Sequence, residues 1–174
     1  MNIKPFTAII CALAFGASIP AVAQETEKDR IEAAYKADRE RCNGLSGNAK
    51  DICQAEVKGK QKIALADLDA RTKNTVKARQ DARMVRADVQ YNIAKEKCDD
   101  LAGNKKDVCV QEAKAVQTKA RADAKADRQT SDARGDAAET KRDADYKVAM
   151  ERCDSLSGDA KDACVKSAKT KYGK

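Results

Sequence analysis

The sequence YNIAKEKCDDLAGNKKDVCVQEAK, residues 91–114, occurs in three related copies within this 174-residue chain. The other copies are YKADRERCNGLSGNAKDICQAEVK at residues 35–58 and YKVAMERCDSLSGDAKDACVKSAK at residues 146–169. They share the pattern Tyr-x6-Cys-x2-Leu-x-Gly-[Asn/Asp]-x-Lys-Asp-x-Cys-x4-Lys, and they begin at nearly equal intervals, at Tyr35, Tyr91 and Tyr146. A recurring segment of this kind indicates one structural unit used three times.

Each copy contains a turn signal midway between its two cysteines. Gly103 suits the left-handed conformation that ends a helix, because a β-carbon is penalised there. We expect Asn104 to cap the next helix, with Asp107 three residues later in a capping-box-like position where the helix dipole favours negative charge. The corresponding residues of the other copies are Gly47, Asn48, Asp51, Gly158, Asp159 and Asp162. The repeat therefore predicts three αα-hairpins.

The cysteines of each copy lie on opposite sides of the turn, so we expect them to face each other and form disulfides. The predicted pairs are Cys42–Cys53, Cys98–Cys109 and Cys153–Cys164. A disulfide closing about a dozen residues contributes roughly 3 kcal/mol in the chain-entropy model. Metal binding or redox catalysis is the alternative, but the chain has no histidine and these cysteines lack the short spacings typical of such sites.

Helical spacing places a tyrosine and a leucine on the same face as the first cysteine of each copy. We therefore expect a small hairpin core built from the disulfide and two further side chains. The predicted core residues are Tyr35, Leu45, Tyr91, Leu101, Tyr146 and Leu156.

Residues 1–23 have the features of a secretory signal peptide. Lys4 precedes an apolar run, and Ala-Val-Ala at residues 21–23 is typical of a cleavage site, which predicts cleavage before Gln24. The apolar run is too short for a transmembrane anchor. Cys11 follows an isoleucine rather than a small residue, which disfavours a lipoprotein. Its removal would leave six cysteines, an even number that fits an oxidising, periplasmic compartment.

The remaining chain, residues 24–174, is interpreted as one elongated helical repeat region. It has no Pro, Phe or Trp, and its only aromatic residues are four tyrosines. Charged residues and alanine dominate, a composition typical of long helices, and a chain this polar cannot bury a large apolar interior. The fold class predicted is all-α, built from elongated antiparallel helical hairpins.

The turn signals predict two long helices flanked by two short ones. The first long helix would span residues 49–101, about 80 Å, and the second residues 105–156. Short helices are expected at about residues 25–45 and 160–172. The first and third turns would then meet at one end. Residues 119–145 offer only alanine as apolar side chains, which leaves open a solvated helix, an alanine-seamed pair or a frayed segment.

The charge pattern gives little indication of a binding or catalytic site. The chain carries 35 basic and 28 acidic residues, but the two signs are interleaved, which disfavours nucleic-acid binding and favours a solvated surface with i,i+4 pairs. Contact with an anionic membrane surface is compatible with the net charge of +7. Without histidine or a desolvating core we expect no enzyme activity and no cofactor. Binding of a hard cation by carboxylates stays open, although no loop has suitable ligand spacing.

The repeated Tyr-Cys-Leu-Gly-Lys-Asp-Cys pattern resembles that of small exported Ala/Lys-rich proteins of proteobacteria, which are often labelled cell-envelope or TolA-like. The resemblance implies a non-enzymatic periplasmic spacer or adaptor that contacts another envelope protein, and it supplies no catalytic or binding residues. The alternative function is a periplasmic holdase chaperone that binds unfolded clients, by analogy with the small, basic helical hairpins of Skp and Spy.

Overall fold

The computed structural model describes residues 21–174, with side chains from residue 26 onward, and it is all-α across this range. The five helices are α1 (Ala21–Cys42), α2 (Gly47–Lys73), α3 (Val76–Cys98), α4 (Asn104–Asp154) and α5 (Gly158–Tyr172). The all-α prediction is confirmed, with five helices in place of four. The predicted signal peptide lies outside the described residues, except for its last three, which begin α1.

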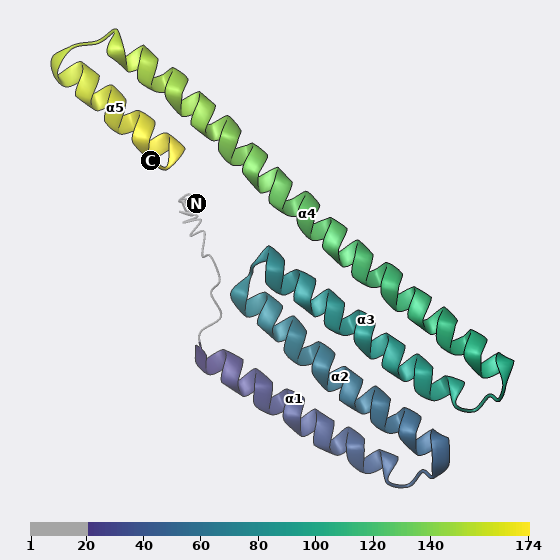
Figure 1. Cartoon of the computed structure of the whole chain (residues 1–174). Coiled ribbons are helices and arrows are strands. Elements are labelled where there is room, and N and C mark those ends of the chain that lie inside the picture. Colours follow the sequence, from purple (N-terminus) through teal and green to yellow (C-terminus); the bar gives the residue numbers. More distant parts are fainter. Residues whose placement is uncertain (1–20) are drawn as a thin grey trace, which may run out of the picture.

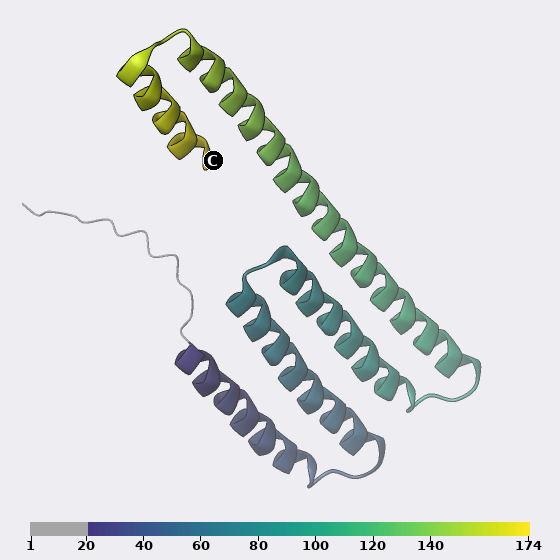
Figure 2. The ribbon, with the colours of Figure 1, turned by 60° about the vertical axis from the view of Figure 1, so that its left-hand side comes forward.

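The helices form an open row instead of a closed bundle. Helices α1, α2, α3 and the first half of α4 lie side by side in chain order, each antiparallel to the one before (Figure 1). In the part of the chain that the structure describes, a helix contacts only its neighbours in sequence. Helix α5 packs against the far end of α4, on the same side as α3 (Figure 2). Most of the helices therefore keep one face exposed to solvent.

The prediction of a single helix over residues 49–101 is wrong, because the chain reverses after α2. Asn74 adopts the left-handed conformation with φ of 47°, and its backbone N–H donates to the carbonyl of Ala70. Thr75 is the N-cap of α3, and its hydroxyl accepts a hydrogen bond of 3.1 Å from the N–H of Ala78. Asparagine tolerates the left-handed region and threonine is a good N-cap, so this turn needs neither glycine nor proline.

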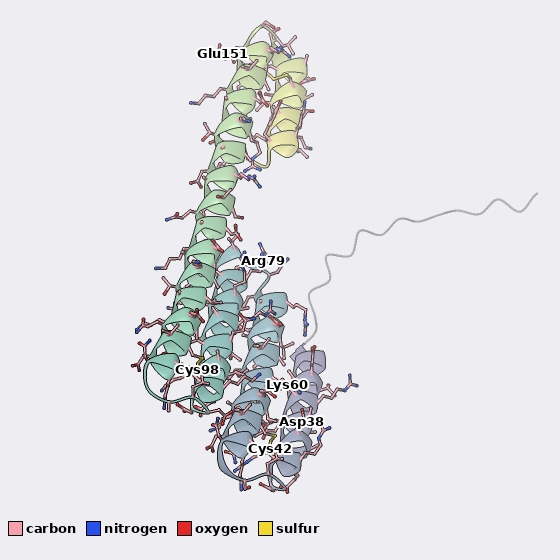
Figure 3. The ribbon with its side chains drawn as sticks, turned by 90° about the vertical axis from the view of Figure 1, so that its right-hand side faces the viewer. Asp38, Cys42, Lys60, Arg79, Cys98 and Glu151 are labelled. Carbon is pink, nitrogen blue, oxygen red and sulfur yellow. A yellow bond between two sulfur atoms is a disulfide. The ribbon has the colours of Figure 1, made fainter. Side chains whose placement is uncertain are left out.

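This additional turn changes which ends of the hairpins meet. Cys42 and Cys98 lie at one end of the molecule, and Glu151 lies near the opposite end (Figure 3). The side-chain amide of Asn48, just after the first turn, donates to the carbonyl of Glu96, just before the second turn, at 2.9 Å. The first turn therefore lies beside the second turn, and the prediction that it meets the third is wrong.

Buried apolar side chains lie on both sides of α2. Val57 and Leu68 are buried on the side of α2 that faces α1, where Val57 lines a groove with Tyr35. On the other side, Ala82 and Val89 of α3 are buried towards α2. Gly59 is also buried, and a β-carbon placed on it would lie 2.4 Å from Cγ1 of Val89. The two helices can approach this closely only because residue 59 has no side chain.

Helix α4 has 51 residues and is about 77 Å long. It agrees with the second predicted long helix, and residues 119–145 are helical throughout. Helix α3 covers the beginning of α4 and α5 covers its end, while every residue from 132 to 142 is exposed. The row α1–α4 and the C-terminal hairpin are therefore joined by a solvated length of helix.

Candidate functional site

The three predicted disulfides are present, one at each repeated hairpin. The Cα atoms are 5.6 Å apart in Cys42–Cys53, 5.8 Å in Cys98–Cys109 and 5.6 Å in Cys153–Cys164. The first cysteine of each pair is fully buried and the second is half-buried. All six sulfurs are consumed in bonds that close the hairpins, so none is a free thiolate for metal binding or nucleophilic attack.

The predicted left-handed glycines are also present. Gly47, Gly103 and Gly158 have φ values of 57°, 57° and 58°. In each turn, the backbone N–H of the leucine donates to the carbonyl of the first cysteine, for example Leu101 to Cys98 at 3.0 Å. The three turns therefore have the same backbone design.

The prediction that the turn leucines belong to the core is wrong. Leu45, Leu101 and Leu156 are 42%, 41% and 43% exposed. Each helix ends at or just after the first cysteine, so the leucine three residues later follows the turn and no longer lies on the helical face. Each leucine instead places an apolar side chain on the surface of a hairpin tip.

The predicted tyrosines are half-buried along the hairpins. Tyr35 lines a small groove between α1 and α2, and Tyr91 is partly covered in α3. Tyr146 packs edge-on against Tyr172, with ring centroids 6.1 Å apart, and the ammonium of Lys171 lies 5.2 Å from the Tyr172 ring. Such aromatic pairs favour T-shaped geometry, so this contact supports α5 on α4.

The helix caps differ from the sequence prediction. Helices α2 and α5 begin at Gly47 and Gly158, with Ser46 and Ser157 as N-caps, and neither serine makes a side-chain capping bond. Helix α4 begins at Asn104 after Gly103. The predicted N-caps Asn48, Asn104 and Asp159, and with them the register of Asp51, Asp107 and Asp162 as capping-box residues, are therefore wrong by one or two positions. A glycine with positive φ is instead the first residue of α2 and of α5 and the N-cap of α4.

Shallow grooves follow the helix pairs, and the one between α2 and α3 has a volume of about 320 Å³. Its lining includes Asp51 and Glu96 together with Lys58 and Lys62. The four groups carry balanced charge, two acidic and two basic, and the groove is open to solvent. A second groove of about 370 Å³ lies between α4 and α5 beside the third disulfide.

Two aspartates have pKa values below their usual range, and the cause is the same for both. Asp99 accepts a hydrogen bond from Lys106 across the second turn, with N···O of 2.8 Å. Asp143 of α4 likewise forms an ion pair with Lys174 at the end of the chain, with N···O of 2.6 Å. The pKa of Lys106 is raised by the same pair. Both shifts are caused by solvent-exposed ion pairs that join two neighbouring helices, and their direction is opposite to the raised pKa of a general acid.

The charged surface contains i,i+4 pairs as predicted, including Lys73–Asp69 and Lys77–Asp81. The sequence reasoning missed the pairs between helices, such as Lys60 with Asp38 at 3.8 Å (Figure 3) and Arg86 with Asp67 at 2.9 Å.

The repeat spacing offered one signal for contacts between helices. The amide of Gln61 donates to Glu32 and that of Gln117 to Asp88, both at 2.7 Å. The second contact follows the first by the same interval that separates the first two copies of the repeat. Equivalent positions of the repeat therefore make equivalent contacts, between α1 and α2 in one case and between α3 and α4 in the other.

Within residues 21–174, no group of three or more His, Cys, Asp or Glu side chains is arranged to hold a metal ion. None of the helices in that range combines the length and the apolar character needed to cross a bilayer. Comparison with protein-family models, with curated proteins and with solved structures gave no match.

Proposed function

We propose that the protein is an exported, non-enzymatic cell-envelope protein that acts as a helical spacer or adaptor. Three disulfides in a small chain favour an oxidising compartment, because cytosolic proteins keep their thiols reduced. The signal-like residues 1–23 support the same compartment. Isolation of the protein from cell fractions tests this part directly. We expect a periplasmic protein whose N-terminal residue is Gln24, and a cytosolic, full-length protein would contradict the proposal.

The observation that carries the spacer function is the separation of apolar tips by a long helix. Leu45 and Leu101 are exposed at one end, and Leu156 is exposed at the other end of α4, about 77 Å away. Exposed apolar side chains at ordered turns suit contact with a partner protein. A molecule of this shape can hold two envelope components at a fixed distance.

Site-directed photo-crosslinking in living cells tests this proposal. A photoreactive amino acid replaces Leu45 or Leu156 at the tips, and Glu139, an exposed residue in the middle of α4, serves as the matched control. We expect one dominant partner captured from a tip and much weaker capture from Glu139. Equal capture from all three positions would contradict docking at the tips.

A holdase chaperone is the second candidate, because large apolar side chains are also exposed along the helices, among them Leu65, Val116 and Val148. Together with the basic charge, these could bind unfolded clients. The same crosslinking experiment separates the two functions: many unrelated clients captured along the helices indicate a chaperone. Purified protein would then also suppress aggregation of an unfolded model substrate at stoichiometric concentration.

A further inference from the structure

Helix α4 is the sequence counterpart of α2, its turn and α3 taken together. Gly47 at the start of α2 corresponds to Gly103, and Cys98 at the end of α3 corresponds to Cys153. The similarity continues between the cysteine motifs. Residues 75–82, TVKARQDA, correspond to residues 130–137, TSDARGDA, with five of eight positions identical. One copy of this unit folds as a hairpin and the other is straight.

Three polar contacts join α2 to α3. The amide of Asn48 donates to the carbonyl of Glu96 at 2.9 Å. Lys97 pairs with Glu56 at 3.0 Å, and Arg86 pairs with Asp67 at 2.9 Å. These contacts sit on either side of the close approach at Gly59 and fix the register of the two antiparallel helices.

Helix α4 retains residues equivalent to those that form all three contacts, although the contacts themselves are not made. In the order used above, the corresponding pairs are Asn104 with Glu151, Arg152 with Glu112, and Lys141 with Asp123. The residue type or the charge is the same at every position. In the straight helix the members of a pair are far apart, and Glu112 and Arg152 are separated by about 60 Å along the axis. The side chains of Glu112, Asp123, Lys141 and Arg152 are exposed, and none forms an ion pair with another described residue.

These residues lie on one face of α4. At 100° per residue, Asp123 and Lys141 are separated by five whole turns, and Glu112 and Arg152 lie within about 40° of each other. Val116 and Val148, which are 58% and 52% exposed, fall on the same face. We call these six residues the α4 face. Helix α3 contacts a different side of α4, through residues such as Ala124 and Arg128.

The α4 face is complementary to itself. Its acidic residues precede residue 132 and its basic residues follow it. Glu112 and Arg152, Asp123 and Lys141, and Val116 and Val148 are each placed symmetrically about residue 132. A second α4 lying antiparallel with its centre at residue 132 would therefore place acid opposite base and valine opposite valine. Because each ion pair would occur twice, the two-fold arrangement would form four of them.

The turn after α2 explains why the α4 face should be covered by a second copy of α4 and not by the other half of the same helix. The interval between equivalent residues shortens by one at this point, so that Asn74 and Thr75 correspond together to the single residue Thr130. Asn74 supplies the left-handed conformation that reverses the chain. Without its counterpart, α4 continues straight and presents both halves of the interface outward. Shortening a hinge in this way favours exchange between copies.

We propose that two copies of this chain associate through the α4 face, with their α4 helices antiparallel about residue 132. Each half of the contact then reproduces the two ion pairs of the α2–α3 interface, with Glu112 opposite the partner's Arg152 and Asp123 opposite the partner's Lys141. The third pair, Asn104 and Glu151, is not brought together in this register. The inference rests on the α4 contacts and is independent of where the protein is located.

Sedimentation equilibrium of the protein with its disulfides intact tests the proposal. The basic-face variant Glu112→Arg/Asp123→Arg and the acidic-face variant Lys141→Glu/Arg152→Glu each place like charges opposite one another in a homodimer. We expect the unchanged protein to dimerise with rising concentration and each variant to associate more weakly by roughly tenfold or more. An equimolar mixture of the two variants should recover association, because the basic and acidic faces then oppose each other.

The matched control is Glu139→Arg. It makes the same kind of charge change within the exposed residues 132–142 of α4, on the side of the helix opposite the α4 face. It should leave dimerisation unchanged, and circular dichroism should show equal helix content in all variants. The proposal would be overturned if the protein without substitutions stayed monomeric up to about 1 mM. Solution scattering would then show whether α4 folds back on itself. The proposal would also be overturned if the mixture failed to associate, or if Glu139→Arg weakened the dimer as much as the face variants.

Discussion

The close approach of α2 and α3 makes Gly59 the position where an added methyl group should do most harm. In an ordinary helix interior, replacing glycine by alanine stabilises the fold by about 1 kcal/mol. At residue 59, however, the new β-carbon would lie 2.4 Å from Cγ1 of Val89 and 3.3 Å from Cδ1 of Ile93. Val89 is β-branched and buried in a helix, so it has little freedom to rotate away.

Gly135 provides the internal reference, because it is also within a helix and a β-carbon there would meet nothing within 4 Å. The helix-propensity gain is common to both substitutions, so their difference isolates the packing cost. Overpacking a core by one methyl group costs about 1–3 kcal/mol. We therefore expect Gly135→Ala to raise the free energy of unfolding by about 1 kcal/mol. The free energy of unfolding of Gly59→Ala should be lower than that of Gly135→Ala by about 1–3 kcal/mol.

The measurement is urea unfolding followed by circular dichroism, at a protein concentration low enough to avoid association and with the disulfides intact. The two variants must have similar m-values for their free energies to be compared. In a Val89→Ala background the clash is removed, so Gly59→Ala should become neutral or stabilising. The double-mutant cycle of these two substitutions measures the coupling energy between residues 59 and 89. If Gly59→Ala stabilised the unchanged protein as much as Gly135→Ala does, the close packing of α2 on α3 would be refuted.

Three further predictions concern the turns. Replacing Cys153 and Cys164 by serine should cost roughly 3 kcal/mol locally and release α5, because a lone helix of 15 residues is marginal; amide exchange should rise in α5 and stay unchanged in α1–α3, and protection retained in α5 would contradict this. The pKa of Asp99, lowered in the folded protein by its bond from Lys106, gives a stabilising contribution that is complete above the unfolded value of about 3.9 and is lost as the pH falls through the folded value; an NMR titration of Asp99 should show its pKa rising in Lys106→Gln. Inserting an asparagine between Gln129 and Thr130 should restore the missing turn residue, so that α4 folds back and the longest dimension in solution scattering falls by roughly 40 Å; an unchanged dimension would count against the assigned role of Asn74.

The hairpins could be predicted because their signals are local. Gly103 and its counterparts mark a left-handed residue, and the cysteines of each copy are placed symmetrically about it. The paired bonds follow from that placement. The turn leucines were assigned to the wrong environment because helical periodicity was extended past the end of the helix. Leu101 falls after Cys98, where the chain has already turned.

The row of helices was harder to predict, because its decisive turn carries a weak signal. Asn74 and Thr75 lie in a polar stretch without glycine or proline, and either residue is tolerated in a helix. The one-residue change in repeat spacing, combined with the match between residues 75–82 and 130–137, locates this point. That signal becomes interpretable only when the fold of one copy is known, because spacing alone does not say which copy contains the turn.

The composition of α4 follows from the absence of that turn. Helix α2 buries Val57 and Leu68 and helix α3 buries Val89, whereas α4 has alanine at the three equivalent positions. Alanine, lysine and arginine have high intrinsic helix propensity, and pairs such as Arg128–Asp132 add i,i+4 support. The nucleation cost is offset at both ends, where α3 and α5 hold α4 in helical form. High helix propensity and packing at both ends therefore favour an exposed, continuous helix over the disordered linker that composition alone would allow.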